Sequence, residues 1–184
     1  MENISANSFL SDIKNGCPQL KRFLNYARIV ERVEQQDEIV KLVHRFNWSL
    51  PQEVQDDAVK KFLDLAEEED YALLPIIGEK RTWENATHAI KSAGYPKNKQ
   101  ALPGLMFLFQ DINWPGALES VAILKDIDRR VVMPFIAAAI KDAFDSKDYQ
   151  WLWGIRCFLN DAQICKSEFE EEDVYDLLAH ADLY

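Results

Sequence analysis

The sequence predicts an all-α protein made of stacked helical hairpins. Hydrophobic residues make up 48% of the 184 residues, which is enough apolar material to build a core. Only 6 glycines and 7 prolines occur, too few for the many turns of an all-β protein. A degenerate motif also recurs three times, and the apolar residues inside each copy have helical spacing.

The repeat is anchored on three prolines that stand 28 and 31 residues apart, namely Pro75, Pro103 and Pro134. Seventeen positions before each anchor stands a small residue, in turn Ala58, Ala86 and Ala117. Larger apolar residues recur at other fixed distances from the anchors. Small residues at one position of every copy let neighbouring helices approach closely, as they do in a stacked array of hairpins.

Each copy is expected to hold two helices joined by a polar connector. In the third copy Ala117, Val121 and Leu124 share one face of a first helix, because residues three and four apart are neighbours on a helix. Met133 and Ile136 begin the apolar stripe of the second helix. The anchoring prolines are expected in the first turn of each second helix, where a missing N–H costs nothing.

First helices are expected to begin at Trp83 and Trp114, twenty residues before an anchor proline. Trp114 is expected to pack against the preceding second helix. The predicted N-terminal caps are Thr82, Asn113 and, in the first copy, a capping box of Ser49 with Gln52.

Flanking segments extend the array in both directions. Residues 1–46 are expected to form N-terminal capping helices at 18–33 and 37–46, and residues 47–184 a repeat array within one continuous domain. A fourth hairpin is predicted from residues 149–160 and a last helix, capped by Ser167 with Glu170, that runs toward Ala181. Together these segments predict a right-handed α-solenoid of four to five HEAT-like hairpins.

Three short motifs give the chain a family resemblance. They are Gly94-Tyr95-Pro96, Asp111-Ile112-Asn113-Trp114-Pro115 and Trp151-Leu152-Trp153. In these motifs, and in a second helix that contains proline, residues 70–160 resemble the bacterial domain of unknown function 5071. The resemblance implies a HEAT-like fold, and it carries no reaction and no catalytic residues.

The net charge of −10 is unevenly spread along the chain. Residues 1–45 carry 7 basic and 6 acidic groups, residues 46–144 carry 11 and 15, and residues 145–184 carry 3 and 10. Such a surface repels phosphate backbones, so nucleic acid and anionic membranes are poor partners. A basic protein is the expected partner.

The sequence gives little support for catalysis, a cofactor or a metal site. His44, His88 and His180 are scattered over separate copies and have no zinc-binding spacing. Cys157 and Cys165 are expected to be buried free thiols. The first twenty residues have no apolar core, and the longest uncharged stretch, 100–110, is far shorter than the roughly 20 residues of a membrane span. We therefore expect a cytoplasmic, non-enzymatic protein.

Candidate binding residues lie on second helices, which line the concave side of the array if the resemblance holds. The positions outside the apolar register there are Tyr71, Met106, Gln110, Arg130 and Lys141. Trp151 and Trp153 are two apart and cannot share a helix face, so one of them should be exposed. Residues 106–109 are apolar on all sides, which predicts either a fully covered helix, the favoured alternative, or a sticky patch.

The leading functional hypothesis is a non-enzymatic HEAT-like repeat protein that binds another protein. It takes two forms, an immunity-type antidote to a bacterial toxin and a general adaptor or scaffold of a cytoplasmic complex. A nucleic-acid-acting HEAT-like enzyme is the third alternative. Such an enzyme needs a basic groove, and the acidity of this chain disfavours it.

Overall fold

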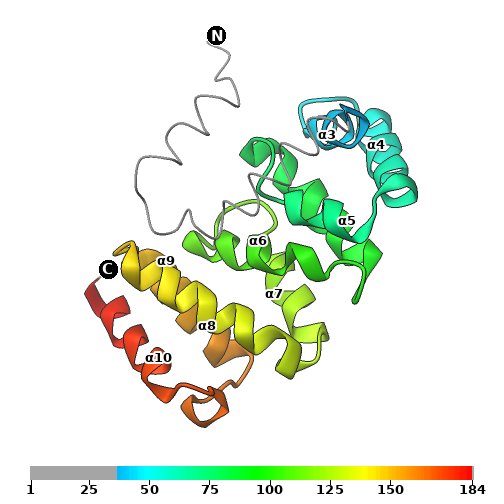
Figure 1. Ribbon diagram of the computed structural model, residues 1–184. Coiled ribbons are helices and arrows are strands. Elements are labelled where there is room, and N and C mark those ends of the chain that lie inside the picture. Colours follow the sequence, from blue (N-terminus) through cyan, green and yellow to red (C-terminus); the bar gives the residue numbers. More distant parts are fainter. Residues whose placement is uncertain (1–36, 184) are drawn as a thin grey trace.

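The computed structural model describes residues 37–183 (Figure 1). Within that range every regular element is a helix and no strand occurs, so the predicted all-α class is confirmed there. The α-helices are α3 (Asp37–His44), α4 (Gln52–Leu65), α5 (Trp83–Ala93), α6 (Leu102–Phe107), α7 (Ala117–Asp126), α8 (Arg129–Asp145), α9 (Tyr149–Asp161) and α10 (Glu172–Asp176). The 3₁₀ helices are η1 (Glu68–Leu73), η2 (Lys80–Thr82), η3 (Lys99–Ala101), η4 (Leu108–Gln110), η5 (Lys166–Glu168) and η6 (Leu177–Leu183). The capping helix expected at 18–33 lies outside the described residues, as does Cys17.

Elements that stand at similar distances from successive anchor prolines contact one another. α4 contacts α5, and α5 contacts α7. η1 contacts η3 and α6, and α6 contacts α8. α9 and η6 pack on each other and on α8, so the described chain progresses from α3 and α4 at one end to α10 at the other (Figure 1).

The aligned alanines are buried, one in each of α4, α5 and α7. Ala58, Ala86 and Ala117 are all 0% exposed. A larger side chain at such a position would have to displace the neighbouring helix, because protein interiors are close-packed. Leu65, an apolar residue ten positions before Pro75, is 52% exposed at the last position of α4.

The anchor prolines do not share one structural role. Pro103 lies in the first turn of α6, as predicted. The expectation is wrong for Pro75, which follows η1 in a turn: the first copy has a 3₁₀ helix in place of a second α-helix. It is also wrong for Pro134, which lies inside α8. The Asp128 side chain accepts a hydrogen bond from the N–H of Arg130, and this cap starts the helix more than a turn before Pro134.

Helix starts also differ from the predicted caps. α5 begins at Trp83, but the hydroxyl of Thr82 donates to the carbonyl of Glu79 and does not cap the helix. α7 begins at Ala117 and not beside Trp114, because Gly116 has a φ of +82° and interrupts the turn before it. Positive φ is costly for residues other than glycine.

The first and last predicted capping boxes are both absent. Ser49 donates its hydroxyl to the side chain of Asn47, and α4 starts later, after Pro51. Near the C-terminus the capping box consists of Cys165 and Glu168 around η5, because the Glu168 carboxylate accepts from the N–H of Cys165 at 3.0 Å. α10 therefore begins at Glu172 and not after Ser167.

Candidate functional site

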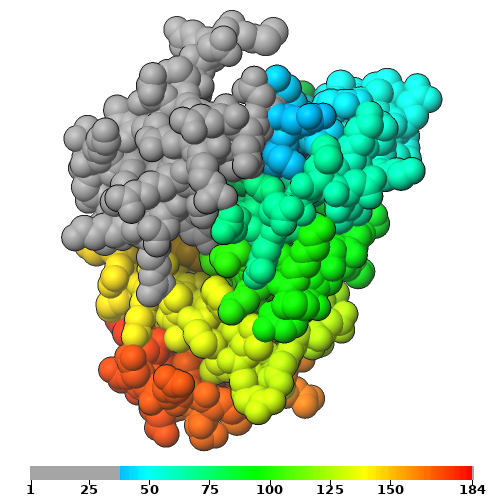
Figure 2. Space-filling view, turned by 45° about the vertical axis from the view of Figure 1, so that its right-hand side comes forward, coloured from blue at the N-terminus to red at the C-terminus, as the bar shows by residue number. Residues whose placement is uncertain are grey.

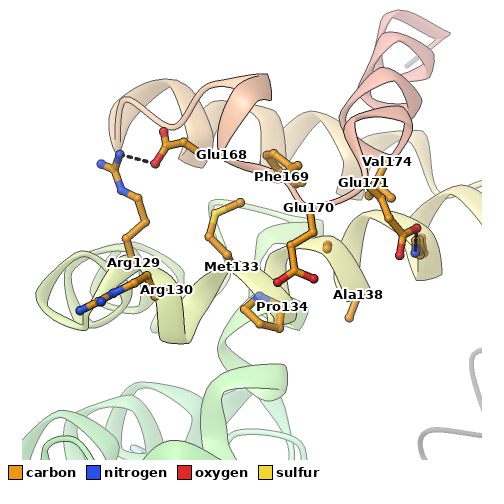
Figure 3. Close-up of a pocket in the computed structure, with 12 residues that line it drawn as sticks. Arg129, Arg130, Met133, Pro134, Ala138, Glu168, Phe169, Glu170, Glu171 and Val174 are labelled. Atoms are coloured by element: carbon orange, nitrogen blue, oxygen red, sulfur yellow. Dashed lines mark hydrogen bonds and ion pairs between the residues drawn. The ribbon is translucent and has the colours of Figure 1, made fainter.

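A groove runs along α8, between this helix and the segment 165–174 that precedes and enters α10 (Figure 3). Its volume is about 540 Å³. The residues that line it are Arg129, Arg130, Met133, Pro134, Ala137, Ala138, Lys141, Glu168, Phe169, Glu170, Glu171 and Val174. The space-filling view shows the C-terminal residues (orange to red) at one end of the molecule, beside α8 (Figure 2).

The floor of the groove is apolar because α8 presents one stripe of small and medium side chains there. Met133 lies four positions before Ala137, and Pro134 four before Ala138, so these two pairs share one side of the helix. Phe169 faces them from the opposite wall (Figure 3). Alanines leave room above the helix that larger side chains would fill.

Two ion pairs join the walls. Arg129 contacts Glu168 at 2.8 Å, and Lys141 contacts Glu171 at 2.7 Å. Hydrogen bonding from Arg129, followed by that from the N–H of Cys165, holds the pKa of Glu168 below its ordinary value. Because all four side chains are partly exposed, each pair adds little stability by itself and weakens in salt.

Arg129 also binds the end of α9. Its guanidinium donates to the carbonyl of Ala162 at 2.7 Å and to that of Gln163 at 3.4 Å. One side chain therefore connects the start of α8, the end of α9 and the outer wall of the groove. The planar, five-donor guanidinium suits this branched geometry better than an ammonium group.

Arg130 turns toward its own helix cap. It contacts Asp128 at 2.7 Å, and hydrogen bonds from its side chain and N–H lower the pKa of that carboxyl group to about 2. The side chain of Arg130 is nonetheless 91% exposed at the mouth of the groove. All three cations that line the groove thus have a carboxylate partner.

Glu170 differs from the other charged groups in the groove. Its carboxylate points inward, toward the side of α8 that carries Pro134 (Figure 3). Among residues 37–183 it has no ionic partner. The groove therefore contains one carboxylate whose charge the described structure leaves unbalanced.

Two of the predicted binding residues, Arg130 and Lys141, line the groove. Gln110 is half-buried away from it, and Trp153 is 38% exposed on α9.

Tyr71, Met106 and Trp151 are buried, so their assignment as surface contacts is wrong. The ring of Tyr71 packs edge-on against Phe62, and burial, then the charge of Asp70, raises the pKa of Tyr71 to about 12. Met106, Leu108 and Phe109 are buried and Phe107 is half-buried, and α9 lies so close that a Cβ at Gly154 would collide with the carbonyl of Phe109. The favoured covered alternative is thus confirmed for these three residues and holds only in part for Phe107.

The paired tryptophans of the repeat are structural. The rings of Trp83 and Trp114 are 5.1 Å apart, and Trp114 packs on Phe107 of α6 at 5.7 Å. The predicted contact of Trp114 with the preceding second helix is confirmed. Lys80 lies over the Trp114 ring at 4.1 Å, a cation–π contact that covers the outer side of this cluster.

The two described cysteines are exposed, so the expectation of buried thiols is wrong. Cys157 lies on the outer face of α9, although partial burial still raises its pKa, against the opposing charge of Arg156. Cys165 precedes η5 at the surface.

Sequence reasoning missed the outer wall of the groove. Neither Phe169 nor Glu171 is among the candidate binding residues that the sequence indicates. A weak signal is present in the sequence: Pro134 stands close to the small residues Ala137 and Ala138, which leave part of the helix surface low.

Within residues 37–183, no cluster of three or more histidine, cysteine or acidic side chains has metal-binding geometry. No helix in the same range combines the length and the apolar character that a membrane span requires. Comparison of the chain with protein-family models, characterised proteins and solved structures gave no significant match.

Proposed function

We propose that this chain is a non-enzymatic, cytoplasmic protein-binding module, and that the groove between α8 and residues 165–174 receives a segment of a basic partner protein. The observation that carries the proposal is the groove, with its apolar floor and acidic outer wall. Residues 128–145 hold three acidic and three basic side chains, whereas residues 165–176 hold six and one, a net of −5. Such a wall attracts basic partners and repels nucleic acid.

The wider architecture that we propose is a right-handed solenoid of HEAT-like hairpins. The contacts of α4 with α5 and of α5 with α7 support it, as do those of η1 with α6 and of α6 with α8. In a solenoid each repeat contacts its neighbours along the chain. An antidote that masks a basic toxin is the narrower form of the proposal, and a toxin-like reading frame beside the gene would favour it over a general scaffold.

Filling the groove tests the proposed binding surface. Ala138→Trp should occupy the space above α8 without removing any polar contact, because Ala138 is half-buried on the groove side. The matched control is Ala122→Trp, the same change at an exposed position of α7. Tagged full-length proteins are used for capture from the source cell and its competitors. A protein retained by the wild type and the control but lost with Ala138→Trp supports the proposal; identical capture by all three contradicts it.

A further inference from the structure

Two hydrogen-bond acceptors belong to residues that line the groove. The first is the carboxylate of Glu170, which has no ionic partner among residues 37–183 and points into the groove (Figure 3). Glu168 and Glu171, the other carboxylates that line the groove, are already paired with Arg129 and Lys141. A ligand can therefore reach Glu170 without breaking an existing ion pair.

The second acceptor results from Pro134. In a helix the N–H of residue 134 would donate to the carbonyl of Arg130, but proline has no N–H. The proline ring also crowds the carbonyl four residues earlier. Pro134 and Arg130 both line the groove, so the carbonyl that lacks its usual donor belongs to a residue of the groove.

The surface around these acceptors is suited to an aliphatic stem. Met133, Ala137 and Phe169 line the groove beside Glu170. Arginine and lysine bury their methylene groups along apolar surface while the charged head reaches a polar partner. Of the two, arginine offers five donors in a planar fork, enough for a carboxylate and a carbonyl together.

We infer that the groove is a recognition site for an arginine side chain of the partner protein, with Glu170 and the Arg130 carbonyl binding the guanidinium and the apolar stripe of α8 holding its stem. This deepens the proposed function and rests on it. The three cations of the groove do not repel such a ligand strongly, because Arg129, Arg130 and Lys141 each have a carboxylate within 2.8 Å.

The test is a titration of the ¹⁵N-labelled full-length chain with a capped tetrapeptide that contains one leucine and one arginine. The matched peptide has glutamine in place of arginine. The expected result is a set of amide shift changes confined to residues 129–141 and 168–174, with the arginine peptide bound at least about tenfold more tightly, as expected for a charge-assisted hydrogen bond. Equal binding of both peptides, or shifts centred elsewhere, would overturn the inference.

Variants assign the two acceptors. Glu170→Gln should weaken the arginine peptide about tenfold, whereas Glu172→Gln, the same change at an exposed residue outside the groove, should not. Pro134→Ala returns the missing N–H to the helix, so it should weaken the peptide while leaving the melting temperature unchanged or higher. Unaltered peptide affinity in both Glu170→Gln and Pro134→Ala contradicts the assignment.

The two proposals fail in distinguishable ways. If Ala138→Trp abolishes capture of a partner but the arginine and glutamine peptides bind alike, the groove is a protein-binding surface and only the arginine assignment is wrong. If the arginine peptide binds selectively at the groove and Ala138→Trp leaves capture unchanged, the pocket exists but is not the surface that holds the partner.

Discussion

The indole N–H of Trp151 donates a hydrogen bond to the backbone carbonyl of Met106 at 2.8 Å. The two residues are 45 positions apart, and the bond is buried between α9 and α6. The sequence predicts both as exposed binding residues, because one is aromatic and the other is a flexible apolar residue outside the apolar register. Their direct contact explains why neither reaches the surface, and it identifies the junction of α6 and α9 as part of the core.

Trp151→Phe should remove this hydrogen bond while retaining an aromatic ring. The Met106 carbonyl loses a buried donor, so the free energy of unfolding should fall by about 1–3 kcal/mol. Chemical denaturation checks the value. Trp153→Phe, on the same helix but 38% exposed, is the control and should cost less. A larger loss for the control would contradict the assignment of Trp151 to the core.

Ala117→Asp should place an unpaired charge at a position that is 0% exposed. The expected loss is several kcal/mol, because a carboxylate cannot be desolvated there without a partner. Glu172→Ala changes an exposed residue in the first turn of α10, so it should cost no more than about 1 kcal/mol. Similar melting temperatures for the two variants would mean that the aligned alanines do not mark the contacts between copies.

Gly154→Ala should be strongly destabilising although it adds one methyl group to a helix. The added Cβ would collide with the carbonyl of Phe109, which belongs to the backbone and cannot rotate away. We expect a loss of about 1–3 kcal/mol or more, typical of overpacking. Asn160→Ala, at an exposed position of α9, supplies the control. A Gly154→Ala protein as stable as the wild type would show that α9 and η4 can separate freely.

The ionised carboxylate of Asp128, which caps α8, should stabilise the fold, and this stabilisation should be lost in acid. Arg130 lowers the pKa of Asp128 from 3.8 to about 2, so the unfolded chain binds more protons than the folded one between these values. The contribution is complete above about pH 4 and disappears as the pH falls toward 2. Asp128→Asn retains a capping oxygen but cannot ionise, so the melting temperature of this variant should depend less on pH in this window. Melting temperatures of both proteins across the window test it, and parallel curves would contradict it.

Salt should slow the association of a cationic ligand with the acidic outer wall of the groove. Glu170, Glu172 and Asp173 have no ion pair with another described residue, whereas Glu171 is held by Lys141. Replacing these three carboxylates by amides should lower the association rate and leave the melting temperature nearly unchanged, because steering acts on on-rates. Stopped-flow mixing with the arginine peptide at about 50 and 500 mM salt measures it. Equal association rates at both salt levels would exclude steering by this wall.

The sequence predicts the all-α class and the burial of the aligned alanines better than the helix ends. The alanine spacing identified Ala58, Ala86 and Ala117 as core positions because a helix must present small residues wherever another helix approaches. Pro75 and Pro134 share the same alignment, yet one lies in a turn and the other inside α8. Local capping interactions decide where helices start. The cap by Asp128 and the preference of proline for the first helical turn predict different starts for α8, and the sequence alone does not decide between them.

The sequence indicates only the α8 side of the groove. Arg130 and Lys141 were singled out because they interrupt the apolar register of one helix, which is local information. Its opposite wall comes from residues 165–174, and no spacing rule relates these residues to α8. The resemblance to the domain of unknown function 5071 ends before them and stays a prediction, as does the solenoid.

The two ion pairs that join the walls also set the length of what can lie between them. Arg129 and Lys141 are twelve residues apart on α8, which at a rise of 1.5 Å per residue corresponds to about 18 Å. An extended chain advances about 3.3 Å per residue, so roughly five residues fit between the two bridges. The spacing of the two bridges therefore limits the part of an extended ligand that lies between them to a short segment.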